Sequence, residues 1–294
     1  MSQLLPHLKS ELDGAYGVTV LFPRVLEDGA TKLLVRDSKR RPAYVVLVSS
    51  AITPMAVSKA MDAARAAHEA VGDELGEAIL LPEYESTVDG RTYAALPYHK
   101  PLVDSRFYRW RYRRKLLPKV SDWLGRAVKA TAVPVATNHR EAAFGVPLEY
   151  LIESDATPPV VRDAAKEARA RLGREWSPKW SLMHGDLWLS NILHAPAEGR
   201  LPFRLIDWPD CRVRGYAFYD LVRLFESFGG SRELMAQAVN QQVKSLDCER
   251  QDARSYLAAA LGLLGLHRGH FPLEAYVAMA EKAVRRLDSV LELE

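Results

Sequence analysis

The sequence lacks the features that mark secreted and membrane-spanning proteins. Two cysteines among 294 residues exclude a disulfide framework. No apolar run approaches the roughly 18–20 residues needed to cross a bilayer, and the N-terminus has no basic segment followed by an apolar stretch, as a signal peptide would. A net charge of +3 is small for this length and indicates no general affinity for polyanions. We therefore expect a cytoplasmic protein without a membrane span.

The positive charge that the chain does have is concentrated in one segment, Arg106–Lys115. This segment holds six basic and four aromatic residues. Interleaved cations and rings are typical of surfaces that bind single-stranded nucleic acid, and such arginines could also hold an anionic substrate such as a sugar phosphate. A third interpretation is an amphipathic helix that packs its rings on the protein and exposes its arginines. We predict the third arrangement, and therefore no nucleic-acid partner.

The first hundred residues alternate β-rich runs with turn signals. Asp28-Gly29 and Asp89-Gly90 are typical of tight hairpins. Pro54, at the start of an alanine-rich amphipathic segment, indicates the beginning of a helix over 53–71. Strands are predicted at 17–25, 32–36, 43–48, 79–86 and 91–96. The predicted order is three strands, one helix and two strands.

Beyond residue 101 the spacing of apolar residues becomes helical. Helices are predicted at 104–117, 119–131, 146–153, 159–172, 218–228, 232–246, 252–267 and 273–293. A segment of short apolar runs and turn residues, 180–208, interrupts them. The chain is therefore predicted to be an α+β protein, with a β-rich first part and a mostly helical second part.

The interrupting segment carries the residues that indicate chemistry. Leu182-Met-His-Gly-Asp-Leu-Trp-Leu-Ser-Asn191 is followed by Leu205-Ile-Asp-Trp208. Phosphoryl transfer from a nucleotide needs a carboxylate near the attacking hydroxyl. It also needs an amide oxygen and a second carboxylate to hold Mg²⁺ on the phosphates. Asp186 and Asn191 have the same offset as Asp and Asn in the kinase catalytic loop.

These two motifs resemble those of the kinase-like phosphotransferases that include aminoglycoside phosphotransferases, choline kinases and fructosamine kinases. The family shares His-Gly-Asp-x-x-x-x-Asn, followed by Ile-Asp-(Phe/Trp). The resemblance implies a bilobal protein-kinase-like fold, with a five-stranded antiparallel N-lobe and a mostly helical C-lobe. The implied N-lobe is 1–97, the hinge 98–101 and the C-lobe 102–294, which contains a catalytic loop over 182–193 and a metal loop over 205–210. ATP or GTP and Mg²⁺ are the implied cofactors.

The resemblance also assigns roles to individual residues. Asp186 is the candidate catalytic base, and Asn191 and Asp207 are the expected Mg²⁺ ligands. His184 is expected to hold the catalytic loop rather than to react. Asp220 matches the family's later aspartate, which braces the catalytic loop through backbone N–H groups.

The sequence departs from the kinase pattern at the lysine that holds the nucleotide phosphates. That lysine belongs on the third strand, but the predicted strand 43–48 carries no cation. Lys32 or Arg36 on the preceding strand could reach the phosphates, with Asp62 or Glu69 of the helix as a possible partner. Alternatively, Asp13–Gly17 is the phosphate loop and 32–36 is the true third strand. At the hinge, Pro97 and Tyr98 are expected to offer backbone groups to the purine.

The sequence thus predicts a small-molecule kinase that phosphorylates a substrate hydroxyl. Gly185 and Trp208 replace the Arg and Phe-Gly typical of protein kinases and favour the small-molecule branch. Candidate acceptors are antibiotics, amino alcohols and sugars, and the basic segment favours a sugar or glycan hydroxyl. The alternative is a pseudokinase that keeps the fold as a binding protein without turnover. A metal-dependent hydrolase would need further His or Asp ligands, which the sequence does not place near the motif. The oligomeric state is left open.

Overall fold

The computed structural model describes residues 8, 12, 17–21, 30–103, 105–195, 198–269 and 271–293. Two sequence expectations, a phosphate loop beginning at Asp13-Gly14 and a hairpin turn at Asp28-Gly29, lie outside the described residues. The chain divides into two compact units. The β-rich unit holds the described residues as far as Glu69, with Gly76–Leu102 and Ile192–Asp210, and the helical unit holds Ala70–Leu75, Val103–Asn191 and the described residues from Cys211 onward. The predicted lobe boundaries, 1–97, 98–101 and 102–294, stay predictions.

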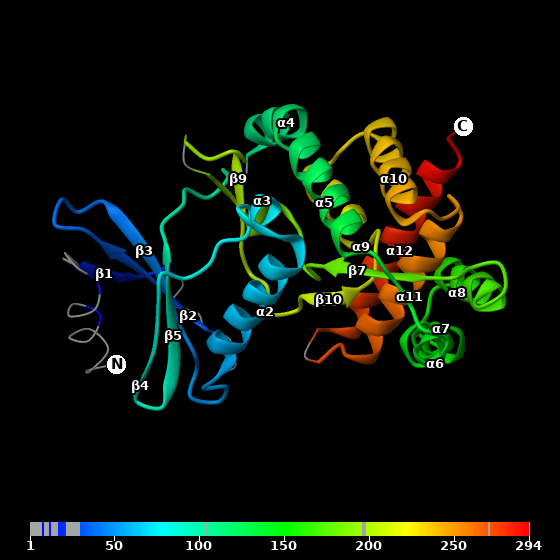
Figure 1. The fold of residues 1–294 in the computed structure, drawn as a ribbon, viewed down its shortest axis with the longest axis horizontal. Helices are drawn as coiled ribbons and strands as arrows, with labels where there is room; N and C mark the ends of the chain where they lie inside the picture. The colour runs from blue at the N-terminus through cyan, green and yellow to red at the C-terminus, as the bar shows by residue number, and fades with distance from the viewer. Residues whose placement is uncertain are drawn as a thin grey trace. The chain divides into compact units, whose positions relative to one another are not determined.

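The β-rich unit contains the five-stranded antiparallel sheet that the sequence predicts (Figure 1). Its strands are β1 (Gly17–Val20), β2 (Thr31–Arg36), β3 (Pro42–Val48), β4 (Tyr84–Val88) and β5 (Arg91–Pro97), in the order β1-β2-β3-β5-β4. Helix α2 (Ala56–Val71) connects β3 to β4. The predicted strand 79–86 is shorter than expected, because Ile79 makes only an isolated bridge to Leu205 and β4 begins at Tyr84.

Both faces of the sheet are covered, because side chains alternate along each strand. On one face Leu33, Val46 and Tyr93 belong to one buried cluster. On the other face Ala94 and Leu96 pack with Val57 and Met61 of α2 and with Leu193, and Leu47 and Ile206 lie against that second cluster. This second face therefore joins the sheet to the segment that contains the predicted metal loop.

That segment is a hairpin of β8 (Ile192–His194) and β9 (Phe203–Leu205). Its backbone is bonded to the rest of the β-rich unit. The Leu205 amide donates to the Ala78 carbonyl at 2.6 Å, and the His194 amide donates to the Lys100 carbonyl at 2.9 Å. Asp207, two residues beyond β9, therefore belongs to the same compact unit as Lys32.

The helical unit confirms the predicted helices to within a few residues at each end. Its long helices are α4 (Arg106–Lys115), α5 (Leu117–Thr131), α7 (Val146–Glu153), α8 (Pro159–Arg171), α9 (Tyr219–Phe228), α10 (Arg232–Leu246), α11 (Asp252–Leu266) and α12 (Leu273–Leu291). A small sheet of β10 (Arg212–Gly215), β7 (Lys179–Met183) and β6 (Val133–Pro134) accompanies them. The sequence analysis missed β6, β10 and the π-helical turn Glu141–Gly145.

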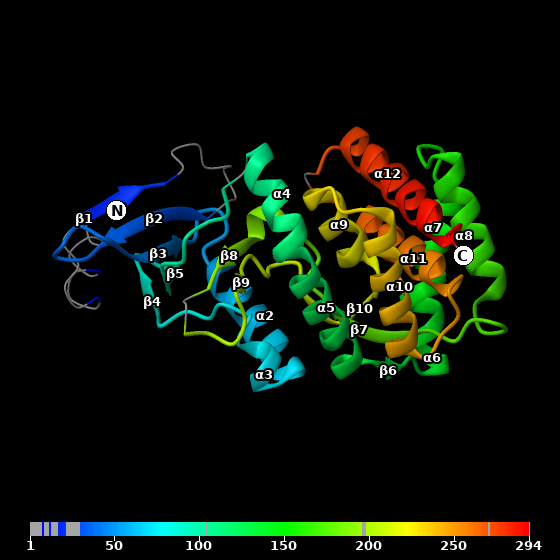
Figure 2. The ribbon, with the colours of Figure 1, turned by 90° about the horizontal axis from the view of Figure 1, so that it is seen from above.

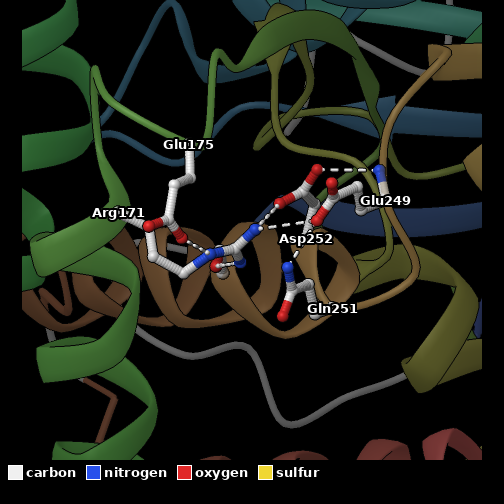
Figure 3. Close-up of polar contacts among 6 residues, drawn as sticks. Arg171, Glu175, Glu249, Gln251 and Asp252 are labelled. Carbon is white, nitrogen blue, oxygen red and sulfur yellow. Dashed lines mark hydrogen bonds and ion pairs between the residues drawn. The ribbon is translucent and has the colours of Figure 1, made fainter.

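A buried ion pair fixes α8 to the start of α11 (Figure 3). Arg171 donates to the Asp252 carboxylate at 2.7 Å and to the Ser255 hydroxyl at 3.4 Å. Asp252 also accepts the Glu249 amide at 2.9 Å, so both of its carboxylate oxygens are used. A charge buried in this way is tolerated only when it is paired and hydrogen-bonded. This cluster therefore has a structural role, and it positions helices far apart in the sequence.

Helix α4 forms within the predicted range and exposes its described arginines as predicted, but most of its rings do not pack on the protein. Only Tyr112 among its aromatic residues is buried, and the Tyr112 hydroxyl accepts the Val103 amide at 3.2 Å. The side chains of Phe107 and Trp110 are 66% and 51% exposed, and Tyr108 is exposed as well. The expectation that the rings pack on the protein is therefore wrong. Among the residues that the structure describes, no helix combines the length and the hydropathy that a membrane span requires.

Candidate active site

The His-Gly-Asp motif forms a tight turn at the end of β7, in the helical unit. Gly185 adopts φ of 88°, a left-handed conformation that only glycine adopts without strain. Asp220, in the first turn of α9, accepts the His184 amide at 2.5 Å and the Gly185 amide at 3.0 Å. The Asp186 amide donates to Nδ1 of His184 at 3.3 Å. His184 and Asp220 thus hold the turn, as expected of structural residues.

Asp220 is a buried carboxyl group with a raised pKa. The pKa of Asp220 is raised to about 7, chiefly by burial and also by the negative charge of Asp186, while the N–H groups of His184, Gly185 and Leu187 act in the opposite direction. The cost of burying this carboxyl group is therefore only partly offset by its hydrogen bonds. We therefore expect the titration of Asp220 to affect the stability of the protein.

We expect Asp220→Asn to flatten the dependence of stability on pH. The carboxyl pKa is 3.8 in the unfolded chain and about 7 in the folded protein. Its contribution to the free energy of unfolding is therefore full below about pH 4 and declines as the pH rises toward 7. Asparagine does not titrate, and it leaves one backbone N–H without an acceptor, at a cost of about 1–3 kcal/mol. Urea unfolding at several pH values measures both effects.

The matched control for this experiment is Asp163→Asn, because Asp163 is exposed on α8. That variant should keep the pH slope and the stability of the parent. Equal slopes for the parent and Asp220→Asn would show that folding does not shift the pKa of Asp220.

Asp186 is held in place by Asn191. The Asn191 side-chain amide donates to the Asp186 carbonyl oxygen at 2.8 Å and to Oδ2 of its carboxylate at 3.0 Å. The five-residue offset allows this contact because Leu189–Asn191 forms a 3₁₀ turn. The Leu189 amide in turn donates to the Ser227 hydroxyl of α9 at 3.1 Å. Ser227 is a supporting residue that the sequence analysis missed, and no local pattern points to it.

Lys32 and Asp207 approach each other within the β-rich unit. Lys32 lies opposite Leu47 in the register of β2 and β3, so the two side chains share the face that packs against Ile206. Nζ of Lys32 lies 3.9 Å from Oδ2 of Asp207. Asp207 has φ of 69°, a conformation that aspartate tolerates better than most residues, and the next residue, Trp208, is buried.

The other cation suggested by the sequence, Arg36, has a different environment. It donates to the Arg40 carbonyl at 3.3 Å, in the turn between β2 and β3. On α2, Asp62 pairs with Arg65 at 2.7 Å, and Arg65 also pairs with Glu85. Glu69, the other helix carboxylate considered, is exposed. Lys32 is thus the cation that the structure brings to a predicted metal ligand.

At the predicted hinge, neither Pro97 nor Tyr98 has a backbone N–H group left for a ligand. Pro97 has no N–H group, and the Tyr98 amide donates to the Ala43 carbonyl at 2.8 Å. The Lys100 carbonyl accepts the His194 amide. The expectation that Pro97 and Tyr98 offer backbone groups to a purine stays a prediction.

The comparisons with known proteins concern the family and the fold of the chain. The model of the phosphotransferase enzyme family, APH, matches residues 90–256. No curated protein matches the sequence. The structure of the gentamicin-APH(2'')-IIa complex is 12% identical, with a TM-score of 0.53 over 99% of this chain and 98% of that one. ADP-bound APH(2'')-Ib gives the same identity, TM-score and coverage.

A thermostable mutant of aminoglycoside phosphotransferase APH(4)-Ia is 14% identical, with a TM-score of 0.56 over 94% of each chain. At such identities the likeness shows the fold. The predicted protein-kinase-like fold, with a five-stranded antiparallel sheet and a mostly helical part, is confirmed.

Proposed function

We propose that this chain transfers the γ-phosphoryl group of ATP to a hydroxyl of a small molecule. The chain belongs to the phosphotransferase enzyme family and is an ATP-dependent phosphotransferase. The observation that carries the proposal is the fixed position of Asp186. Asn191 holds its carboxylate, and Asp220 holds the turn from which it projects. A catalytic group must be held in a productive orientation before the substrate arrives.

Asp186 is the proposed base. It orients the acceptor hydroxyl and takes its proton as the phosphoryl group is transferred. Because the transition state is loose, proton loss comes late and a strongly basic group is not required. Asn191 bonds Oδ2 of this carboxylate and so limits its rotation.

Asn191 and Asp207 are the proposed Mg²⁺ ligands, and their chemistry fits that ion. Asn191 directs its N–H group at Asp186, which leaves its amide oxygen as the group suited to a hard cation. Within the described parts of the chain, no cluster of three His, Cys, Asp or Glu residues could hold a metal. This suits an ion that takes most of its ligands from phosphates and water. When bound, Mg²⁺ neutralises charge on the phosphates.

Lys32 is the proposed phosphate-binding cation in the β-rich unit. Its approach to Asp207 places a positive charge beside a predicted metal ligand, although it lies on β2 rather than β3. This supports turnover and weakens the pseudokinase alternative, whose motivation was the missing third-strand lysine.

The proposed acceptor class is a sugar or glycan hydroxyl, with antibiotics and amino alcohols as the other candidates. One of the similar structures is a complex of APH(2'')-IIa with gentamicin, and that ligand belongs to that enzyme. In this chain the exposed basic helix α4 gives no support to a strongly cationic acceptor.

An acceptor panel tests the proposal. The assay contains ATP and Mg²⁺, with GTP as the comparison donor. In the presence of at least one sugar the protein should release nucleoside diphosphate, and the mass of that sugar should increase by one phosphoryl group. Removal of Mg²⁺ by a chelator should abolish both signals. If calorimetry shows binding of Mg-ATP but no sugar, aminoglycoside or amino alcohol is phosphorylated, the pseudokinase alternative replaces the proposal.

A further inference from the structure

Helix α4 presents an exposed surface that the proposed chemistry does not use. Four of its residues recur at helical spacing on one side of the helix, Phe107, Trp110, Arg111 and Arg114. All four are exposed. Tyr112, which is buried, lies on the opposite side, and the Arg113 guanidinium lies close to Gly229 at the end of α9. The helix is thus anchored on one side and leaves the four residues facing outward.

The outward residues form a continuous strip of rings and guanidinium groups. The Arg114 guanidinium carbon lies 5.2 Å from the centre of the Trp110 ring, and the Phe107 and Trp110 rings are 6.4 Å apart. No acidic residue occurs in α4, whereas six of its ten residues are basic. A partner for this strip must therefore be anionic and must also bury aromatic surface. In both ribbon views α4 leads directly into α5 at the edge of the helical unit (Figure 2).

We propose that α4 docks the protein on an anionic phospholipid bilayer as a peripheral membrane contact. Exposed Trp and Phe side chains bury their rings at the level of the lipid headgroups, and neighbouring arginines bind the phosphates. This assignment goes beyond the transfer reaction and does not depend on the acceptor.

The arrangement of the rings favours a bilayer over single-stranded nucleic acid. Bases stack on free faces of aromatic rings, along a groove that follows the phosphate backbone. Here the Trp110 ring already contacts Arg114 and Phe107, and the strip is the convex side of a ten-residue helix. Insertion into a headgroup layer needs apolar area and positive charge but no free ring face.

Sedimentation with vesicles tests the proposal on the full chain. The protein should sediment with phosphatidylcholine vesicles that contain phosphatidylglycerol, and remain in solution with phosphatidylcholine alone. Arg111→Gln and Arg114→Gln should each weaken binding about fivefold. The double variant Phe107→Ser with Trp110→Ser should weaken it on the order of tenfold or more, although it keeps every charge. The matched control is Lys129→Gln with Lys244→Gln, which removes two exposed cations from α5 and α10 and should bind as the parent does.

Fluorescence gives a second measurement that does not depend on the α4 double variant. Brominated lipid should quench part of the tryptophan emission of the parent, and this quenching should be lost in Trp110→Phe. The proposal is overturned if the parent ignores anionic vesicles, or if the α4 variants sediment like the control. It is also overturned if a labelled single-stranded RNA, or a second copy of the protein detected by light scattering, binds the strip in place of vesicles.

Discussion

Asp186→Asn should lower kcat about a thousandfold while the protein stays folded. Loss of a positioned general base typically costs 10²–10⁴ in rate, so about three decades is the expected scale. The substitution keeps the shape of the side chain and an oxygen that can accept the Asn191 amide, which now bonds the carboxylate at 3.0 Å. The measurement is steady-state transfer to the acceptor identified in the panel, with thermal unfolding as the check on folding.

The loss should appear in kcat, because Asp186 is proposed to act on the acceptor hydroxyl during transfer. Calorimetric binding of Mg-ATP should change little. Asp163→Asn on α8, an exposed carboxylate outside the proposed site, is the matched control and should leave kcat unchanged. A variant that retains a tenth or more of the parent kcat would remove Asp186 from the role of base.

The turn that contains Asp186 could be predicted from the sequence in part, because some of its contacts are local, whereas the Asp220 carboxylate that also holds it comes from α9. The Asn191 contact to Asp186 spans five residues and needs only one 3₁₀ turn. The need for glycine at 185 follows from a positive φ within the same turn. The succession of three strands, one helix and two strands along the chain was predictable for a similar reason, since alternation and hairpin signals act between neighbours in the chain.

The approach of Lys32 to Asp207 could not be read from the sequence in the same way. It depends on the register between β2 and β3 and on the packing of Ile206 against the same face of the sheet. The β8–β9 hairpin joins that face through backbone bonds to Ala78 and Lys100, which lie far from it in the chain. A strand pattern shows which residues alternate, but it does not show which distant loop lies over them.

The prediction that the rings of α4 pack on the protein was wrong for a different reason. Rings and arginines alternate so closely in α4 that the side with Phe107 and Trp110 also carries Arg111 and Arg114, and the hydrophobic pattern has little contrast. The side of α4 that faces the protein is the side that makes two contacts. The Tyr112 hydroxyl accepts the Val103 amide, and Arg113 lies near Gly229. Both are tertiary contacts that periodicity does not encode.

Lys32→Met should lower kcat/KM for ATP about a hundredfold, whereas Arg36→Met should stay close to the parent. Removing one positioned donor to a developing negative charge commonly costs 10²–10³ in rate. Lys32 lies 3.9 Å from Asp207, and Arg36 is bonded to the Arg40 carbonyl in a turn. Steady-state kinetics with varied ATP, together with Mg-ATP binding by calorimetry, distinguish the two residues.

Loss of activity in Lys32→Met would reflect weaker use of the nucleotide and not unfolding of the protein. The Lys32 and Asp207 side chains are 39% and 42% exposed, and an ion pair this exposed contributes only about 0–1 kcal/mol to stability. The two variants each remove one cation from the same strand, so each serves as the control for the other. Equal losses in both would mean that strand charge in general, and not the position of Lys32, supports nucleotide use. Parent-like kinetics in both would direct the search to the segment that begins at Asp13-Gly14, the alternative phosphate loop in the sequence.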